Sequence, residues 1–535
     1  MKIHSTKDLN VSFLGITPVL KDATGTLGPQ DIVALSGLLT FKGKSIQDLL
    51  KESVEKNENL KEKITKILKR SSLKGHASLS TTPVLCFSYE ASKFLDSALT
   101  GMTFASALMA SGRRTKTTID DIFFPTSILG KAKAKEIYFR ASQKNIDFSN
   151  FLLQKSIPKD EASKILQYGI YGTGIVQFPI ESIVSLKKEY EIEKEWMPEE
   201  VGFLLSKIEK QLKNYGIDLL YATRQVAPRD TYPYPNIFKD PKRLNIVRSL
   251  INSKKTNSST EIISANFLPA PGLKKQLGEL KKDINTSLKN RAGIKNNWHR
   301  ILLKRRQIIR DYNPAVNIKI LSTVAWRIWG EKKRHRTVPM AVESIYYCLE
   351  KTIKVFNKYK NRIKNRELND KVLKEIESVF SLPPAIKASP EFLNAWLQRA
   401  LDSFFIYERL IKSGIKPRDA IFVIPRSLKI DVLQEYNLFN LIAGYFPLRL
   451  CSTVEEELRR LTIKEVLEIK KLLEAKGWGW LADHLVVKCH TVGFCLEKEF
   501  CGMIKAQIRD YDTNLHEDIH QDLEDKLQGI INTAF

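Results

Sequence analysis

Residues 332–344 read KKRHRTVPMAVES and bring four cations together with one histidine. They follow an apolar and aromatic run from Val316 to Trp329, whose first part predicts a strand and whose second part predicts a helix. Arginines and a histidine at the end of a helix can hold a phosphate or pyrophosphate through charge-assisted, often bidentate hydrogen bonds. Such a run can also be a solvated helix end. Its meaning therefore depends on partners elsewhere in the chain.

The composition describes a large, basic, globular protein. The chain has 535 residues, of which 43% are hydrophobic, so it is long enough for two domains and too apolar to be disordered overall. The net charge of +26 predicts an anionic partner. Nucleic acid, a phospholipid surface and a small phosphorylated ligand all satisfy that prediction, and so does a set of lysines that only solvates helices.

The apolar and cysteine patterns disfavour a membrane protein and a disulfide-rich one. No apolar run approaches the ~20 residues that span a bilayer, so we expect a cytoplasmic protein without a membrane partner. Six cysteines are too few for a disulfide framework in a chain of this length. Cys489, Cys495 and Cys501, with His490, could ligate a metal, but their spacing matches no standard zinc or iron–sulfur signature, and we expect none.

The character of the chain changes between residues 222 and 270, where proline-rich and polar segments are typical of connections. We therefore predict a first module over 1–222, a linker with a basic helical connection over 223–285, and a second module over 286–535.

Two patterns recur and suggest that the modules are duplicated. A strand, a helix and clustered arginines are predicted at 84–114, with the helix over Lys93–Ala110, and again at 316–336. The segment SIPKDEA at 156–162 resembles GIKPRDA at 414–420, although helix starts of this kind can also match by chance.

These motifs together resemble those of the flavin-dependent thymidylate synthases, whose central motif is R-H-R-x-x-S-x-N-x-x-S-x-R. Arg334-His335-Arg336 matches its opening and Ser344 its second serine. Downstream, Asn437 matches an asparagine of the family, and Leu448-Arg449 matches a late L-R element. In the first module, Gly75-His76-Ala77-Ser78 resembles the family's G-H-x-S element.

The chain also departs from this pattern. Pro339, Ala341 and Tyr346 replace the motif's first serine, its asparagine and its final arginine, and the first module has Gly112-Arg113-Arg114 in place of R-H-R. One hypothesis is that the two modules complement each other, with His76 serving the site at 334–336. The alternative is that flavin or nucleotide binding persists without catalysis.

The resemblance implies an α+β fold of two related thymidylate-synthase-complementing-type modules in tandem, each a sheet with flanking helices. It implies reductive methylation of dUMP to dTMP with FAD as cofactor, and NADPH and methylene-tetrahydrofolate as co-substrates, with no side chain acting as the catalyst. It also implies a homo-oligomer, a dimer of tandem chains. By carry-over, flavin would contact Arg334, His335, Arg336, Asn437 and His76, and dUMP would contact Ser344, Arg449 and Glu343.

A different class of function is also open at this point. The basic helical segment 291–310 and the net charge suggest a nucleic-acid-binding protein. Such a protein would bind DNA or RNA with a steep dependence on salt.

Overall fold

The computed structural model describes most of the chain. The described residues are 3–22, 25–56, 59–72, 77–110, 116–253, 258–288, 291–495, 497, 501–506 and 513–534. They form two compact units that interleave along the sequence. Unit 1 comprises Met1–Leu244, Ala325–Arg336 and Val342–Ile430, and unit 2 comprises Asn245–Val324, Thr337–Ala341 and Asp431–Phe535. Each unit combines helices with an antiparallel or mixed sheet, which confirms the α+β class.

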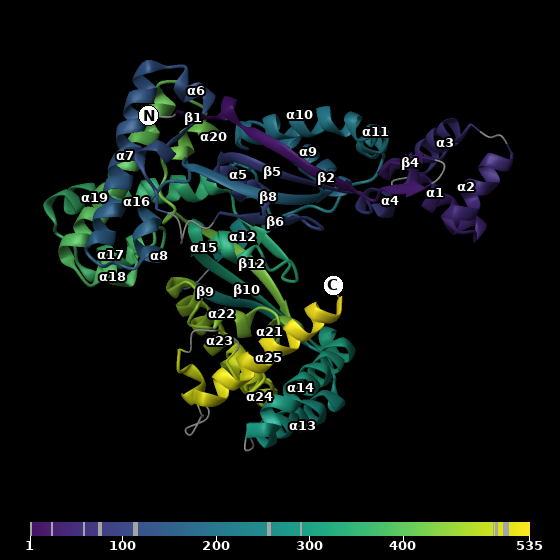
Figure 1. The fold of residues 1–535 in the computed structure, drawn as a ribbon. Helices are drawn as coiled ribbons and strands as arrows, with labels where there is room; N and C mark the ends of the chain where they lie inside the picture. Colours follow the sequence, from purple (N-terminus) through teal and green to yellow (C-terminus); the bar gives the residue numbers. More distant parts are fainter. Residues whose placement is uncertain are drawn as a thin grey trace. The chain divides into compact units, whose positions relative to one another are not determined.

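Unit 1 contains a four-stranded sheet with the order β2-β5-β8-β6 (Figure 1). Its neighbouring strands are antiparallel, and they are β2 (Asn10–Thr17), β5 (Val84–Ser92), β8 (Tyr171–Pro179) and β6 (Ser106–Met109). Along β5 and β8 buried residues alternate with more exposed ones, as expected for a sheet with one face in a core. Helices that cover this core follow β8 in the chain, namely α9 (Ile180–Glu193), α10 (Glu199–Asn214) and α11 (Asp218–Val226).

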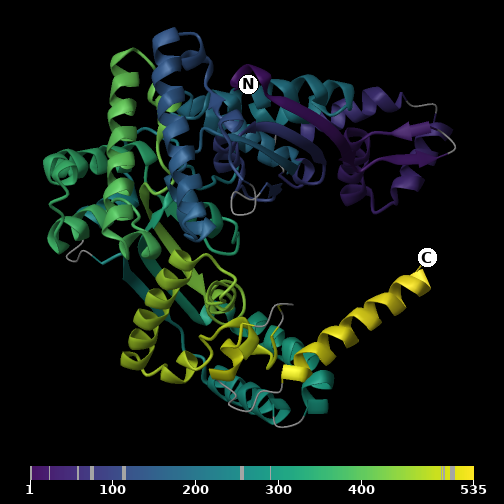
Figure 2. The ribbon, with the colours of Figure 1, turned by 60° about the vertical axis from the view of Figure 1, so that its left-hand side comes forward.

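The remainder of unit 1 is mainly helical. A small hairpin and four helices precede β5: β3 (Leu20–Asp22), β4 (Gly25–Leu27), α1 (Pro29–Lys42), α2 (Ile46–Glu55), α3 (Leu60–Ser72) and α4 (Ala77–Thr81). Two long helices, α7 (Ala132–Gln154) and α19 (Pro390–Lys412), pack side by side (Figures 1 and 2). The shorter helices around them are α6 (Thr126–Leu129), α8 (Lys159–Ala162), α16 (Ile345–Asn365), α17 (Asp370–Glu377), α18 (Pro384–Lys387) and α20 (Pro417–Ala420).

One succession of elements occurs twice with equal lengths. The helices α6, α7 and α8 and the strand β8 have 4, 23, 4 and 9 residues. The helices α18, α19 and α20 and the strand β12 (Lys429–Asn437) have the same lengths in the same order. Asn145 of α7 and Ser403 of α19 are equivalent positions, 258 residues apart, and the Asn145 amide donates to the Ser403 hydroxyl at 3.1 Å.

Reciprocal contacts join the two successions inside unit 1. The Gly169 N–H donates to the Phe422 carbonyl at 3.2 Å, and the Ser427 N–H donates to the Lys164 carbonyl at 3.0 Å. The buried carboxylate of Glu161 accepts from the Ala385 N–H at 2.7 Å. Its counterpart Asp419 accepts from the hydroxyl of Ser127, at 2.6 Å. Each contact thus occurs twice. The donor lies in one succession in the first contact, and the donor of the second contact is the equivalent residue of the other succession.

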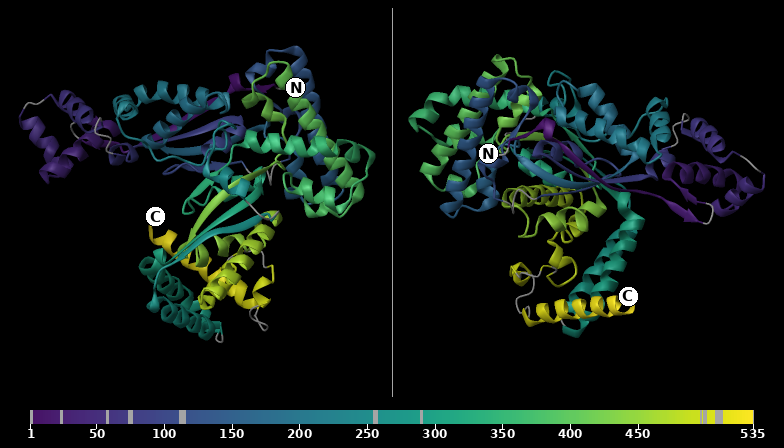
Figure 3. Two further views of the ribbon diagram at one scale, coloured as in Figure 1. Left: turned by 180° about the vertical axis from the view of Figure 1, so that it is seen from behind. Right: turned by 45° about the horizontal axis from the view of Figure 1, so that its top comes forward.

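Unit 2 is built around a sheet with the order β11-β12-β10-β9 (Figures 1 and 3). Besides β12, its strands are β9 (Thr260–Phe267), β10 (Val316–Ala325) and β11 (Met340–Val342). Its helices are α12 (Ile246–Ser253), α13 (Pro271–Leu288), α14 (Arg291–Tyr312), α21 (Leu438–Ile442), α22 (Phe446–Arg449), α23 (Glu456–Ala475), α24 (Gly479–Ala482) and α25 (Thr513–Ala534).

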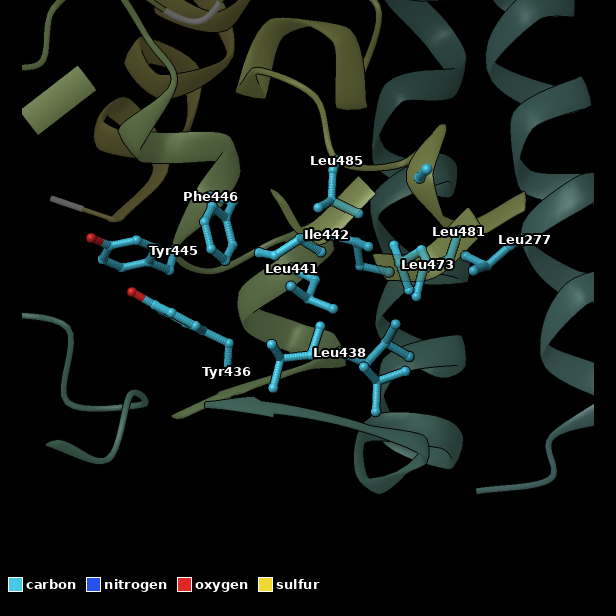
Figure 4. Packing of buried hydrophobic residues seen from close by; sticks show 14 of the residues in the cluster. Leu277, Tyr436, Leu438, Leu441, Ile442, Tyr445, Phe446, Leu473, Leu481 and Leu485 are labelled. Atoms are coloured by element: carbon cyan, nitrogen blue, oxygen red, sulfur yellow. The ribbon is translucent and has the colours of Figure 1, made fainter. Parts of the chain in front are cut away.

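A single apolar core holds the sheet of unit 2 to its helices. Figure 4 shows Leu438, Leu441 and Ile442 of α21 between an aromatic group and the leucines of neighbouring helices. The aromatic group consists of Tyr436, Tyr445 and Phe446, whose ring centroids lie 4.8–5.2 Å apart. Aromatic pairs at such distances add to the free energy gained from burial alone.

The prediction of a helix over Lys93–Ala110 is wrong in its second half. The helix α5 (Lys93–Leu99) ends at Thr100, and residues 106–109 form β6. Gly101 has φ of 90°, a backbone conformation that ends a helix and that favours glycine. The small apolar residues after it pair with β8, a long-range contact that helical spacing cannot reveal. Gly112-Arg113-Arg114 lies outside the described residues.

No helix in the described part of the chain is both long and apolar enough to cross a membrane.

The buried Glu200 predicts a pH dependence of stability. Burial raises the pKa of its carboxyl from 4.5 to about 7, although the Ser92 N–H donates to it at 2.9 Å and the Ser92 hydroxyl donates as well. The native state therefore binds a proton that the unfolded chain has lost, so this contribution to stability is complete below about pH 4.5 and is lost as the pH rises through about 7. We expect Glu200→Gln to flatten the fall in free energy of unfolding between pH 5 and 8, a fall of ~3 kcal/mol at most.

Denaturant unfolding followed by circular dichroism at several pH values measures this effect. Glu191→Gln is the matched control, because Glu191 lies on the neighbouring helix α9 with its side chain 61% exposed. An unchanged pH profile in Glu200→Gln would contradict the assignment.

Candidate functional site

The three-residue cationic motif 334–336 is presented by a short, firmly anchored helix. Strand β10 leads into α15 (Trp326–Lys332), in which Trp326, Ile328 and Trp329 are buried. The Trp326 N–H donates to the Leu428 carbonyl at 2.7 Å, which ties the start of the helix to the backbone before β12. Buried tryptophans and this hydrogen bond fix the direction in which α15 points, and therefore the position of the residues at its end.

A tight turn follows α15 and leaves the arginine side chains in solvent. The His335 N–H donates to the Lys332 carbonyl, and the Arg336 N–H donates to the Arg334 carbonyl, both at 3.2 Å. Arg334 and Arg336 are exposed, while His335 is half-buried. The turn thus presents two guanidinium groups, which are suited to bidentate contacts with phosphate.

Lys333, beside the motif, is buried instead. Its Nζ donates to the Ser97 carbonyl at 2.5 Å. Burial lowers the pKa of this amine to about 7, the charge of Arg334 lowers it further, and Asp96 acts in the opposite direction. The role of Lys333 is therefore to hold α15 against α5 and not to offer a charge to a ligand.

Sequence reasoning did not identify Asp96 of α5, which faces this turn. Its carboxylate accepts from the Tyr89 hydroxyl at 2.5 Å. Burial raises the pKa of Asp96, whereas Lys93, the Tyr89 hydroxyl, Arg334 and Lys333 lower it. The one signal for it in the sequence is a single carboxylate within the largely apolar helix KFLDSAL.

Arg426 is a second residue that the sequence did not single out. It is buried, its Nε donates to the Gln167 carbonyl at 3.1 Å, and its guanidinium lies 4.9 Å from the centre of the Tyr168 ring. Burial lowers its pKa to about 10. Its signal was an arginine inside the otherwise apolar run 421–428. Its Nη2 is buried and has no hydrogen-bond partner within the described residues.

Glu343 and Ser344 lie at the start of α16, where both are buried. The Ser344 hydroxyl donates to the Lys239 carbonyl at 2.6 Å, and its N–H donates to the Glu343 carboxylate at 2.6 Å. The Lys239 ammonium in turn donates to the Val342 carbonyl at 2.6 Å. A phosphate at Ser344 would have to replace the Lys239 carbonyl as the acceptor of the hydroxyl proton.

Asn437 belongs to unit 2 and lies at the junction of a strand and a helix. It is the last residue of β12 and the N-cap of α21, where its Oδ1 accepts from the Asn440 N–H at 3.1 Å and from the Asn440 side-chain amide at 2.9 Å. Asparagine is a preferred N-cap because its side-chain oxygen satisfies an unpaired N–H of the first turn.

Asn440 connects Asn437 to the residue that directly follows the cationic motif. Its amide donates to the Thr337 carbonyl at 3.0 Å, and its oxygen accepts from the Thr337 hydroxyl at 3.0 Å. Thr337 is bonded to Arg336 in the chain. Within unit 2, Thr337 and Asn437 are therefore linked through one buried asparagine.

Asn437 also lines a polar pocket of about 540 Å³ in unit 2. Lys319 and Asn317 of β10 face this pocket, and both contact the Glu435 carboxylate, Lys319 at 3.6 Å. The other lining residues are Ser264, Ala265, Asn266, Asn313, Pro314 and Val316. Amides and a cation are donors and acceptors of the kind that phosphate, ribose and an isoalloxazine ring require.

The two remaining predicted site residues are Arg449 and His76. Arg449 is half-buried and ends α22, where its N–H donates to the Tyr445 carbonyl at 3.0 Å. His76 lies outside the described residues. Unit 1 thus holds Arg334, His335, Arg336, Glu343 and Ser344, and unit 2 holds Asn437 and Arg449.

Part of the second half of the chain is similar to known proteins. Residues 289–473 match the family model of the thymidylate synthase complementing protein. A flavin-dependent thymidylate synthase of Pyrococcus horikoshii is 33% identical over 128 residues, 23% of this chain and 51% of the relative. One of Pyrococcus abyssi is 29% identical over 127 residues, 23% of this chain and 50% of the relative. The chain spans about half the length of the curated relatives it matches.

A solved structure is also similar, but remotely. The UMP/dUMP methylase PolB from Streptomyces cacaoi, bound with 5-Br dUMP, aligns with a TM-score of 0.33 and 11% identity, over 43% of this chain and 100% of that one. A likeness at this level does not bear on fold or ligand.

Proposed function

We propose that this chain methylates dUMP reductively to dTMP with methylene-tetrahydrofolate, NADPH and FAD, since residues 289–473 match the family model of the thymidylate synthase complementing protein and the similar relatives are flavin-dependent thymidylate synthases. The observation that carries the proposal is the link from Asn437 through Asn440 to Thr337, beside the exposed Arg334 and Arg336. Within unit 2, it brings Asn437 to Thr337, the residue that follows the cationic motif in the sequence.

The residues present fit a flavin nucleotide. Two exposed guanidinium groups can neutralise a pyrophosphate or phosphate, and the asparagine amides can hydrogen-bond polar ring edges. When bound, FAD would supply the hydride chemistry, which protein side chains cannot provide. Arg334, His335, Arg336, Asn437 and His76 would hold it.

Other residues would bind dUMP or position the cations. Ser344, Arg449 and Glu343 would bind the nucleotide, and the half-buried Asp96 would orient Arg334 through its charge. Because the turn after α15 is tied to α5 by Lys333, the arginines are held before a ligand arrives, which lowers the entropy lost on binding. We also propose a cytoplasmic location and a homo-oligomer of such chains, in line with the resemblance.

We further propose that the chain contains two tandem modules, one over 1–222 and the other over 286–535, joined by 223–285. The equal element lengths, the reciprocal contacts and the equivalent strand orders β5-β8-β6 and β10-β12-β11 support the duplication. The strand β9, which pairs with β10 as β2 pairs with β5, lies within the predicted linker. Both α5 and α15 have seven residues. They are followed by Thr100-Gly101-Met102-Thr103 in one case and by Lys333-Arg334-His335-Arg336 in the other.

This alignment of α5 with α15 implies one cationic site per chain. The position equivalent to the R-H-R motif is then Gly101-Met102-Thr103, which has no charge for a phosphate, and not Gly112-Arg113-Arg114 as the sequence suggested. The first module would supply His76 and supporting residues such as Asp96, while the second module supplies the cationic ligands. Flavin binding is expected to saturate near one FAD per chain.

The nucleic-acid alternative gains no support from the basic helix α14. Lys304 pairs with Asp283 at 2.8 Å, and Arg310 pairs with its neighbour Asp311 at 2.8 Å. Arg305 is turned inward, toward the Thr491 carbonyl at 3.1 Å. Several of the cations that suggested nucleic-acid binding therefore already form ion pairs or hydrogen bonds within unit 2.

The arginines of the motif give the first test of the proposed function. We expect the purified protein to bind FAD and to release the C5 hydrogen of dUMP with methylene-tetrahydrofolate and NADPH. Arg334→Ala and Arg336→Ala should each weaken FAD binding about 10- to 100-fold, because each removes a charge-assisted contact. Fluorescence titration with FAD and tritium release from dUMP measure the two properties.

Arg140→Ala is the matched control, since Arg140 is an arginine of α7 with its side chain 70% exposed. It should leave both properties unchanged. Protein that binds neither FAD nor dUMP would refute the proposal, and FAD binding without release of the C5 hydrogen would leave only a flavin-binding homologue.

Asn437 gives a second test that separates flavin binding from helix capping. Asn437→Asp keeps the oxygen that caps α21 but loses the amide donor, whereas Asn437→Ala loses both. We expect Asn437→Asp to weaken FAD binding at a nearly unchanged melting temperature. Asn437→Ala should weaken binding similarly and also destabilise unit 2 by ~1 kcal/mol. Normal FAD affinity in Asn437→Asp would exclude an amide contact with the flavin.

A further inference from the structure

Four asparagines line the polar pocket of unit 2. They lie on separate elements: Asn266 on β9, Asn313 on the short helix η4 (Asn313–Ala315), Asn317 on β10 and Asn437 at the end of β12. The family resemblance accounts for Asn437 alone. The other three need a separate explanation, because an amide side chain can take part in ligand recognition from either of its ends.

Hydrogen bonds within unit 2 leave the NH₂ groups of two of these amides available as donors. The Asn313 Oδ1 accepts from the Phe439 N–H at 2.9 Å. A backbone N–H can only donate, so the amide oxygen must face it and the NH₂ group is left for another partner. Asn437 is held in the same way, since its Oδ1 accepts from the Asn440 N–H at 3.1 Å.

Asn317 is held by its other end. Its NH₂ group donates to the carboxylate of Glu435 on β12. An ionised carboxylate only accepts, so the Asn317 oxygen is left as an acceptor. Within the described residues, no hydrogen bond is made by this oxygen or by the NH₂ groups of Asn313 and Asn437. The pocket therefore offers a ligand two fixed donors and one fixed acceptor.

The charge of the pocket favours a neutral group over a phosphate. Lys319 is the single cation among the residues that line it, and its Nζ lies 3.6 Å from the Glu435 carboxylate. The two charges offset each other, so little net attraction is left for an anion. The cavity volume of about 540 Å³ is of the size that holds a heterocyclic ring.

Two donors and one acceptor complement the imide edge of a heterocycle. Such an edge has an N–H between two carbonyl groups, and it occurs in uracil and in the isoalloxazine ring of a flavin. Cytosine and adenine present an amino group and an unprotonated ring nitrogen instead, and the pterin of a folate presents two donors beside one carbonyl. Each of these would leave one of the fixed amide groups without a partner, which costs binding free energy.

We propose that this pocket binds the imide edge of a uracil or an isoalloxazine ring. The NH₂ groups of Asn313 and Asn437 donate to the two ring carbonyls, and the Asn317 oxygen accepts from the ring N–H. The inference rests on the proposed function for the identity of the two candidate rings. It adds Asn313 and Asn317, which no motif of the resemblance contains, as residues that determine which ring is bound.

The sequence does not reveal this arrangement. Asn313-Pro314 predicts the end of a helix, and Asn317 lies in a run that predicts a strand. What turns these amides into a donor and an acceptor are Phe439 and Glu435, which come from a distant part of the chain.

Ligands methylated on the ring N–H test the proposal with the unaltered full-length protein. The titrations compare dUMP with N3-methyl-dUMP and FAD with N3-methyl-FAD. The ring that occupies the pocket should lose affinity about 10- to 100-fold on methylation, because the methyl group removes the donor that Asn317 accepts from. A loss for dUMP indicates uracil, and a loss for FAD indicates isoalloxazine. Equal affinities within both pairs would overturn the proposal.

Substitutions then show whether the loss arises in this pocket. In Asn317→Ala the effect of N3-methylation should shrink to about 3-fold or less for the bound ring, because the acceptor is gone. Asn313→Asp keeps the oxygen that meets the Phe439 N–H and loses the NH₂ donor, so it should bind the unmethylated ring about 10- to 100-fold more weakly. Circular dichroism and the melting temperature establish that each variant is folded.

Asn361→Asp is the matched control, because it makes the same change at an exposed asparagine of α16 in unit 1. It should leave the affinity for both rings unchanged. The proposal is overturned if the effect of N3-methylation persists in full in folded Asn317→Ala, or if Asn313→Asp binds the ring as tightly as Asn361→Asp does.

These titrations involve no turnover, so they separate this inference from the proposed function. Binding that depends on the ring N–H and on Asn317, without release of the C5 hydrogen of dUMP, supports the inference and refutes only the activity. Release of that hydrogen with no effect of N3-methylation overturns the inference alone. Binding of neither dUMP nor FAD overturns both.

Discussion

The hydrogen bonds between residues 164–169 and 422–427 are the constraint on which unit 1 depends. Both segments are almost completely buried, so each of their backbone groups must find a partner inside the protein. The Gly169 and Ser427 amides satisfy the carbonyls of Phe422 and Lys164 in a reciprocal way. In the same region, the Leu428 and Arg426 carbonyls accept the first N–H groups of α15. The direction of α15, and hence of Arg334 and Arg336, follows from this arrangement.

The same region concentrates buried charge. Lys333 and Arg426 are cations in an apolar environment, and burial lowers the pKa of both. Desolvation of such groups costs free energy that their single carbonyl contacts return only in part. Asp96 offsets part of this cost through its charge. Proteins retain costly buried charges where these serve a site, and this cluster lies at the turn that presents the motif.

Unit 2 combines two regions of different character. Its main core joins the sheet to α13, α14, α21 and α23 through large apolar and aromatic side chains. A second core, which contains Cys451, Cys489 and Cys495, is much smaller and lies among irregular segments. Since apolar burial scales with the area removed from water, the smaller core gains less stability from packing and depends more on additional links.

The sequence by itself determined the α+β class, the cationic motif at 334–336 and the resemblance of this motif to that of a known family, because local spacing and residue chemistry carry that information. It also located Asn437 and Ser344 by their distance from the motif. The tertiary structure alone decided that residues 106–109 pair with β8 and that Asn440 joins Asn437 to Thr337. It alone placed Asp96 against the Tyr89 hydroxyl and Cys451 in one small core with Cys489. These contacts connect distant parts of the chain, and their energy depends on burial and on partners that no local pattern specifies.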